Sequence, residues 1–249
     1  MSGPRPLFVC GCARSGTTAL AQLVGSHPRV LLGIERYGRL ARDRFLLEAR
    51  HLEPARFARI EDGDTFYSSF EGRHYWDDGF ADKLAGAVAL AYVGDKKPML
   101  YRFWRELFER FPDARLLFIY REPLAVARSW ERRARAPGGN WPPGRDAAAA
   151  ISEWNRAAAC IRAAARQQQS VCIVSYEGLL SEGWAERIFS WLQLPLTRVV
   201  GDAREALLEA HAVAEAQRGR PAPLALDEEA LGAAVDVDSL AWLEAHRQA

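Results

Sequence analysis

Five short, largely apolar runs recur along the chain, and each is followed by a segment with helical periodicity. They cover residues 7–10, 30–32, 92–98, 115–120 and 171–174. Apolar runs of this length are typical of strands buried on both faces, and their alternation with helices is typical of a parallel sheet. The pattern predicts one α/β domain over residues 1–249, with a central, mostly parallel sheet of about five strands flanked by helices.

Between these runs the sequence predicts helices, two loops and a helical tail. The expected helices cover residues 17–24, 38–60, 81–91, 101–110 and 146–168, and the stretches that follow Pro123 and precede Leu192. Residues 62–80 are rich in Gly, Asp and aromatic side chains, and residues 136–145 are rich in Pro and Gly, so both are expected as acceptor-side loops. Alternatively, the aromatic side chains of 62–80 anchor that loop to the core. Residues 203–249 are expected to form a helical C-terminal extension.

The segment after the first apolar run has the composition of an anion-binding loop. Its sequence is Gly11-Cys12-Ala13-Arg14-Ser15-Gly16-Thr17-Thr18, and an apolar helix follows. A strand, a glycine loop and a helix N-terminus direct backbone N–H groups and a positive dipole at a phosphate. The spacing resembles the P-loop G-x-x-x-x-G-K-[ST], but Thr17 stands where that motif has lysine, and Arg14 lies inside the loop. A P-loop-type fold and a donor with a shorter anionic tail than a nucleoside triphosphate are predicted; an ordinary tight turn is the alternative.

Composition and charge narrow the possible partners and the cellular location. The 33 basic and 32 acidic residues give a net charge of +1, which argues against a nucleic-acid or membrane-surface binder. The four cysteines show neither a pairing pattern nor the Cys/His spacing of a metal site, and this usage fits a reducing cytoplasm. The N-terminal residues do not resemble a signal segment, and no apolar run has the length of a membrane span. We expect a cytoplasmic protein without stable membrane insertion; no pattern indicates its oligomeric state.

Charged residues follow the predicted strands at the edge of the sheet where the loop also lies. Glu35 comes just after the second run, Lys96 lies near the end of the third, and Arg121 follows the fourth. Ligands of an open parallel sheet bind beyond the C-terminal ends of its strands, so these side chains are expected at one rim. A guanidinium such as Arg121 with a hydroxyl such as Ser129 suits a phosphate. The alternatives are a pair between Arg121 and Glu122 and an exposed Ser129.

Together these motifs resemble the sulfotransferases that use 3′-phosphoadenosine 5′-phosphosulfate (PAPS). The elements that carry the resemblance are, in order, Arg14-Ser15-Gly16-Thr17-Thr18, Arg121 with Ser129, and Tyr176-Glu177 before Leu179-Leu180. In that family the first loop holds the 5′-phosphosulfate and the Arg…Ser pair holds the 3′-phosphate. The resemblance therefore implies that PAPS is the donor, that adenosine 3′,5′-bisphosphate (PAP) is the product, and that these residues bind both.

The arginine form of the loop is similar to the tyrosylprotein and bacterial branches of the family, which implies further roles. In the tyrosylprotein branch the catalytic base is a glutamate at the same interval after the loop arginine, which corresponds to Glu35. A lysine two residues before a proline lies at the sulfuryl group, which corresponds to Lys96. The resemblance also implies donor contacts for Arg133 and Tyr176, and a weaker match does so for Arg218.

This chain differs from the tyrosylprotein branch in ways that bear on the acceptor. It has no evident membrane anchor or cysteine pairing, and Ile34 precedes Glu35 where that branch has paired glutamates. The resemblance to bacterial enzymes that act on small molecules or sugars fits better. We therefore expect a small-molecule or glycan acceptor, and a carbohydrate or other polar metabolite is favoured by the arginines near Glu35.

These residues predict in-line transfer of a sulfuryl group from PAPS to an acceptor hydroxyl without a metal. Glu35 takes the hydroxyl proton as general base, while Arg14 and Lys96 offset the negative charge that develops during transfer. A surface ion pair of Glu35 with Arg36 or Arg39 is the alternative. The rival functions are a P-loop small-molecule kinase, which the missing lysine argues against, and a catalytically silent nucleotide-binding protein with the same fold.

Overall fold

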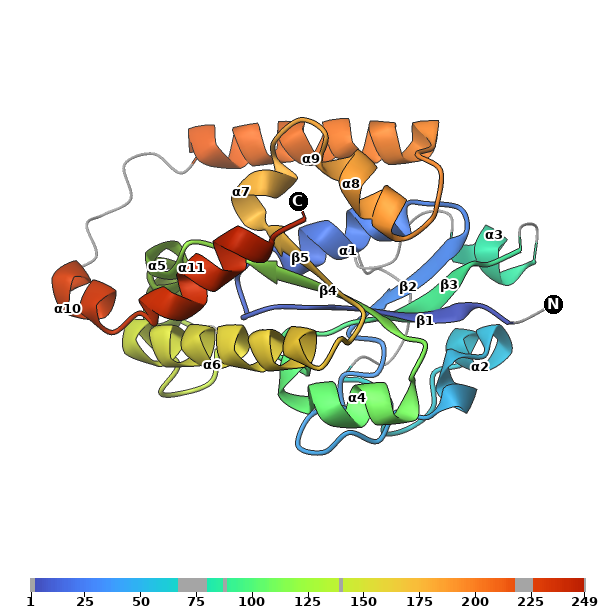
Figure 1. Ribbon diagram of the computed structural model, residues 1–249, viewed down its shortest axis with the longest axis horizontal. Helices are drawn as coiled ribbons and strands as arrows, with labels where there is room; N and C mark the ends of the chain where they lie inside the picture. Colours follow the sequence, from blue (N-terminus) through green and yellow to red (C-terminus); the bar gives the residue numbers. More distant parts are fainter. Residues whose placement is uncertain (1–2, 67–79, 87–88, 139–140, 218–225, 249) are drawn as a thin grey trace.

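The computed structural model describes residues 3–66, 80–86, 89–138, 141–217 and 226–248. Its strands form one sheet in the order β2-β3-β1-β4-β5 (Figure 1). They are β1 (Arg5–Cys10), β2 (Val30–Ile34), β3 (Tyr92–Lys96), β4 (Arg115–Tyr120) and β5 (Val171–Ser175). Every neighbouring pair runs parallel, so the predicted parallel α/β sheet is confirmed, and the C-terminal ends of the strands meet at one edge.

Helices cover both faces of this sheet. One face carries α1 (Thr17–Gly25), α8 (Trp184–Trp191) and α9 (Arg198–Gln217), and the other carries α4 (Trp104–Arg110), α5 (Pro123–Arg135), α6 (Ala147–Arg166) and α11 (Val237–His246) (Figure 1). The shorter helices are η1 (Ala49–Leu52), α2 (Pro54–Ala58), α3 (Phe80–Leu84), η2 (Leu100–Phe103), α7 (Tyr176–Leu179) and α10 (Glu228–Ala233). In the described part of the chain, no helix is both long enough and apolar enough to cross a membrane.

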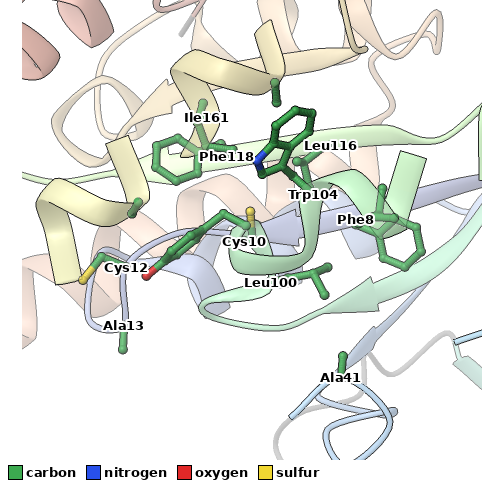
Figure 2. Close-up of a cluster of buried hydrophobic side chains, with 14 of the residues drawn as sticks. Phe8, Cys10, Cys12, Ala13, Ala41, Leu100, Trp104, Leu116, Phe118 and Ile161 are labelled. Carbon is green, nitrogen blue, oxygen red and sulfur yellow. The ribbon is translucent and has the colours of Figure 1, made fainter. Parts of the chain in front are cut away.

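Two hydrophobic layers follow from the alternation of side chains along the strands. Leu7 and Val9 of β1 pack toward α1 and α8, whereas Phe8 and Cys10 pack toward the opposite layer. Figure 2 shows part of this second layer, formed by residues of β1, β4, α4 and α6: Phe8, Cys10, Leu116, Phe118, Trp104 and Ile161. Because β1 is the central strand and is buried on both sides, the loop that follows it starts from a rigid base.

Two predicted helices are wrong in extent. The sequence predicts one helix over residues 38–60, whereas the structure has turns and irregular backbone followed by the short η1 and α2. The reason is that the backbone N–H groups of Arg36 and Tyr37 bond to Asp95, and the Tyr37 hydroxyl donates to the carbonyl O of His51. The helix expected over 81–91 is only α3, followed by a turn in which Gly86 has a φ of 75°.

The C-terminal helices pack against the elements that carry the predicted phosphate-binding residues. The carboxylate of Glu228 in α10 pairs with both Arg128 Nε and Nη2, at 2.7 and 2.9 Å. In α11, Glu244 Oε1 accepts a hydrogen bond of 2.6 Å from the Tyr120 hydroxyl at the end of β4. The described tail is therefore attached to both β4 and α5.

Candidate nucleotide and catalytic site

The loop between β1 and α1 is shaped by close contacts that only glycine permits. A Cβ on Gly11 would lie 2.1 Å from the carbonyl O of Ile119, and a Cβ on Gly16 would lie 2.4 Å from Tyr176 Cδ2. Gly16 also has a φ of 91°, in the left-handed region that favours glycine. The loop therefore lies directly against β4 and the ring of Tyr176, and α1 begins at Thr17 as predicted.

The same loop presents polar groups that have no partner among the residues the structure describes. Ser15 is 0% exposed, and its Oγ has no hydrogen-bond partner among the described residues. The first turn of α1 has no side-chain cap at its N-terminus. Buried hydroxyls and helix N–H groups without partners are costly, and an anion at this position would satisfy both. The chemistry of the loop therefore fits a phosphate or sulfate group.

Arg14 connects this loop to α5 and lies among other arginines. Its Nε donates a hydrogen bond of 3.2 Å to Ser129 Oγ, and Ser129 is buried rather than exposed on the helix surface. The groups packed around the guanidinium lower the pKa of Arg14, and the positive charges of Arg133, Arg121 and Arg132 lower it further. This mutual repulsion among cations is relieved when an anion binds between them.

Arg121 lies at the C-terminal end of β4 beside the glycine loop. Its guanidinium is 4.4 Å from the ring centroid of Tyr176, and its Nε is buried without a partner in the described structure. The alternative pair between Arg121 and Glu122 does not form, because the Glu122 carboxylate caps α5 through the N–H groups of Leu124 and Ala125. The structure thus brings Arg14, Arg121, Ser129 and Tyr176 together; Arg133 contributes charge from an exposed position, and Arg218 lies outside the described residues.

Glu35 and Lys96 meet at the neighbouring corner, where β2 and β3 end. Lys96 Nζ lies 2.9 Å from Glu35 Oε1, with the lysine side chain 2% exposed and the glutamate side chain 33% exposed. Arg36 does not pair with Glu35, because its guanidinium is bound to Asp64 at 2.9 Å. The lysine next in sequence, Lys97, instead donates to the carbonyl O of Gly38. Lys96 is therefore the lysine that accompanies Glu35.

Sequence reasoning missed the buried polar network that supports Glu35. Asp95 is 2% exposed and accepts hydrogen bonds from the backbone N–H groups of Arg36 and Tyr37. Asp64 accepts from both Arg36 and Arg56. The available signal was an aspartate inside a strand, since carboxylates are rarely buried without a partner. Among the described residues, no group of three His, Cys, Asp or Glu side chains is arranged to hold a metal ion.

The fold and the loop define the chain as a P-loop-type nucleotide-binding domain in which Thr17 stands where the usual motif has lysine and Arg14 lies inside the loop. The model of the sulfotransferase family matches residues 6–198, and the chain belongs to this family. It is therefore a sulfotransferase, as the sequence motifs predicted. No curated protein sequence matches the chain.

Solved structures agree with this assignment at the level of the fold. The sulfotransferase STF9 from Mycobacterium avium is 17% identical, with a TM-score of 0.52 over 98% of this chain and 77% of its own. The sulfotransferase STF1 from Mycobacterium tuberculosis is 18% identical, with a TM-score of 0.50 over 82% of this chain and 71% of its own. The sulfotransferase domain of the curacin biosynthetic pathway is 16% identical, with a TM-score of 0.50 over 80% and 77%.

Proposed function

We propose that this sulfotransferase transfers a sulfuryl group from PAPS to a hydroxyl of a small polar acceptor, a carbohydrate or a similar metabolite, in the cytoplasm. The observation that carries the proposal is that two groups of polar side chains, here called the two corners, lie next to each other at the C-terminal edge of the sheet. One is a cationic, glycine-lined site around Arg14 and Arg121, and the other holds the Glu35–Lys96 pair. The free cysteines, three of them buried, support a reducing compartment.

The residues of the first corner suit the two anionic groups of such a donor. Residues 14–18 surround the 5′ end, where Ser15 Oγ and the α1 N-terminus offer donors that no described side chain satisfies. Arg121 and Ser129 bind the 3′-phosphate, with Arg133 adding positive charge and Tyr176 packed against both Gly16 and Arg121. When bound, PAPS supplies the sulfuryl group, and PAP is the product.

The residues of the second corner supply the proton chemistry. Glu35 takes the proton of the acceptor hydroxyl, while Lys96 holds the carboxylate in place through the bond of 2.9 Å. Lys96 and Arg14 also stabilise negative charge that develops during transfer, and removing one such group costs about 100-fold or more in turnover. Glu35 is partly exposed and Lys96 is buried beneath it, so the carboxylate is open to an acceptor from the solvent side.

The function is tested by binding and turnover measured on the same preparations. Calorimetry should show that PAP binds and that ATP with magnesium does not, and turnover should be followed as PAP release from PAPS with a panel of monosaccharides and phenols. Glu35→Gln should retain PAP binding and lose about 100-fold or more in turnover. Glu186→Gln, an exposed glutamate on α8, is the matched control that keeps full activity.

Two outcomes would contradict the proposal. Binding of ATP with magnesium in preference to PAP would show that the loop serves phosphoryl transfer. PAP binding without turnover on any acceptor, and with Glu35→Gln indistinguishable from wild type, would identify a catalytically silent nucleotide-binding protein.

A further inference from the structure

Asp95 is a buried carboxylate that has no role in the proton transfer and donor binding proposed above. It lies near the end of β3, directly before Lys96, and is 2% exposed. Its Oδ1 accepts a hydrogen bond of 3.0 Å from the backbone N–H of Arg36, and its Oδ2 accepts one of 2.9 Å from the N–H of Tyr37. Both oxygens are therefore committed to the two residues that follow Glu35.

The backbone of Glu35 needs such support. Glu35 has a φ of 58°, in the left-handed region that is unfavourable for a residue with a side chain. A conformation of this kind persists only where the surroundings fix it, and it concentrates at functional sites. Here the Glu35 N–H donates to the carbonyl O of Lys96 at 2.7 Å, and the Glu35 carbonyl accepts from Thr65 Oγ1 and from the N–H of Gly38, both at 3.0 Å.

The register of the sheet places both supports of Glu35 on one strand. Gly33 of β2 pairs with Asp95 of β3, and Ile34 pairs with Lys96. Successive residues of β3 thus hold the turn after Glu35 through Asp95 and the carboxylate of Glu35 through Lys96 Nζ. Gly33 leaves room for this arrangement, because a Cβ there would lie 2.9 Å from Asp95 Oδ1.

We propose that Asp95 is a positioning residue that fixes the backbone turn carrying Glu35 and thereby keeps the catalytic carboxylate beside Lys96. The inference rests on the proposed function of Glu35 as general base. A carboxylate can accept from both N–H groups at once, whereas an amide of the same size has one acceptor oxygen and opposes the second N–H with its NH₂ group. The identity of the side chain at this position therefore controls the turn.

The experiment compares Asp95→Asn with wild type in turnover and in PAP binding. We expect kcat to fall by about 100-fold, as for a small displacement of a catalytic group, while PAP affinity stays within about twofold. Glu153→Gln is the matched control, because Glu153 is also a buried carboxylate and accepts from Tyr101 and Arg102. It should lower thermal stability and leave kcat unchanged. Asp95→Ser, which keeps one acceptor without the opposing NH₂, replaces Asp95→Asn where that variant does not fold.

The double variant Glu35→Gln/Asp95→Asn separates positioning from a general structural role. If Asp95 acts through Glu35, the double variant should be no slower than Glu35→Gln alone, because the carboxylate to be positioned is already absent. Multiplicative losses, a parallel loss of PAP affinity, or full activity of Asp95→Asn would overturn the inference. A failure of the proposed function gives a different result, because Glu35→Gln alone would then keep wild-type turnover.

Discussion

Among single residues, Arg121 differs most clearly from an ordinary structural arginine. Arg115 is the first residue of β4, and Arg121 comes directly after its last residue. The guanidinium of Arg115 lies 4.8 Å from the ring centroid of Trp191, and that of Arg121 lies 4.4 Å from the ring centroid of Tyr176. Only Arg121 lies at the C-terminal edge of the sheet, beside Arg14 and the loop. The pair therefore offers an internal comparison between a cation that packs the fold and one that we propose to bind a ligand.

Replacing Arg121 by alanine should weaken binding of the 3′-phosphate specifically. We expect Arg121→Ala to lose about 10- to 100-fold in affinity for PAP, the range for a hydrogen bond between charged groups, and little for adenosine 5′-monophosphate. Calorimetry with both nucleotides measures the difference. Arg115→Ala should bind both as wild type does. An equal loss for the two nucleotides in Arg121→Ala would contradict a 3′-phosphate contact.

Asp95 should give the protein a measurable dependence of stability on pH. Burial raises the pKa of Asp95 to about 6 from an ordinary 3.8, although the N–H groups of Tyr37 and Arg36 and the charge of Lys96 oppose the rise and Glu35 adds to it. The native state therefore binds this proton more tightly than the unfolded chain. The resulting stabilisation is present below pH 3.8 and is lost as the pH rises to about 6.

Urea unfolding of wild type and Asp95→Asn across this pH range measures the effect. The free energy of unfolding of wild type, taken relative to the variant, should decrease by about 3 kcal/mol between the two pKa values. Above about pH 7 the difference between the two proteins should be constant. Parallel curves throughout would show that Asp95 titrates normally in the native state.

At the level of elements, the contact between the glycine loop and Tyr176 joins the end of β5 to the start of α1. Gly16→Ala would add a Cβ 2.4 Å from the Tyr176 ring and would hold a side chain at a φ of 91°. We expect the free energy of unfolding to fall by about 1–3 kcal/mol and PAP affinity to fall with it. Gly201→Ala, in α9 with open space around it, is the control and should be neutral or slightly stabilising.

A second substitution separates the two causes of the Gly16→Ala effect. In Gly16→Ala/Tyr176→Ala the steric contact is gone while the unfavourable φ remains. Part of the lost stability should therefore return, as thermal unfolding would show. If the double variant lost the full sum of both single effects, the loop and the Tyr176 ring would not be coupled as the structure places them.

The strands and the loop could be predicted because their signals are local. The run from Leu116 to Ile119 reads as a buried strand in any context, and the glycine loop with its arginine is contiguous in sequence. The turn that follows Glu35 could not be predicted, since it depends on Asp95, which is distant in sequence and reaches the N–H groups of Arg36 and Tyr37 only once β2 and β3 have paired. The contact between Arg14 and Ser129 is likewise a property of the folded chain, although the residues themselves were predicted.

At the level of the whole molecule, the C-terminal tail completes the layer around α6. Leu243 of α11 is 1% exposed and belongs to the same core cluster as Phe118 of β4 and Ile161 of α6. Beyond α11, the backbone N–H of Gln248 donates to the carbonyl O of Ile173 in β5 at 2.9 Å. The tail thus shares its hydrophobic contacts with the central sheet.

A tail packed in this way should unfold together with the sheet in one transition. Leu243→Ala is expected to lower the free energy of unfolding by about 3 kcal/mol, the cost of removing a buried leucine side chain, and to shift a single cooperative melting curve. Leu196→Ala, at a leucine that is 44% exposed, should have a much smaller effect. An early separate transition, with the sheet melting at its wild-type temperature, would instead make the tail an independent unit. The shared transition follows because α11 loses its partners only when β4 and α6 also come apart.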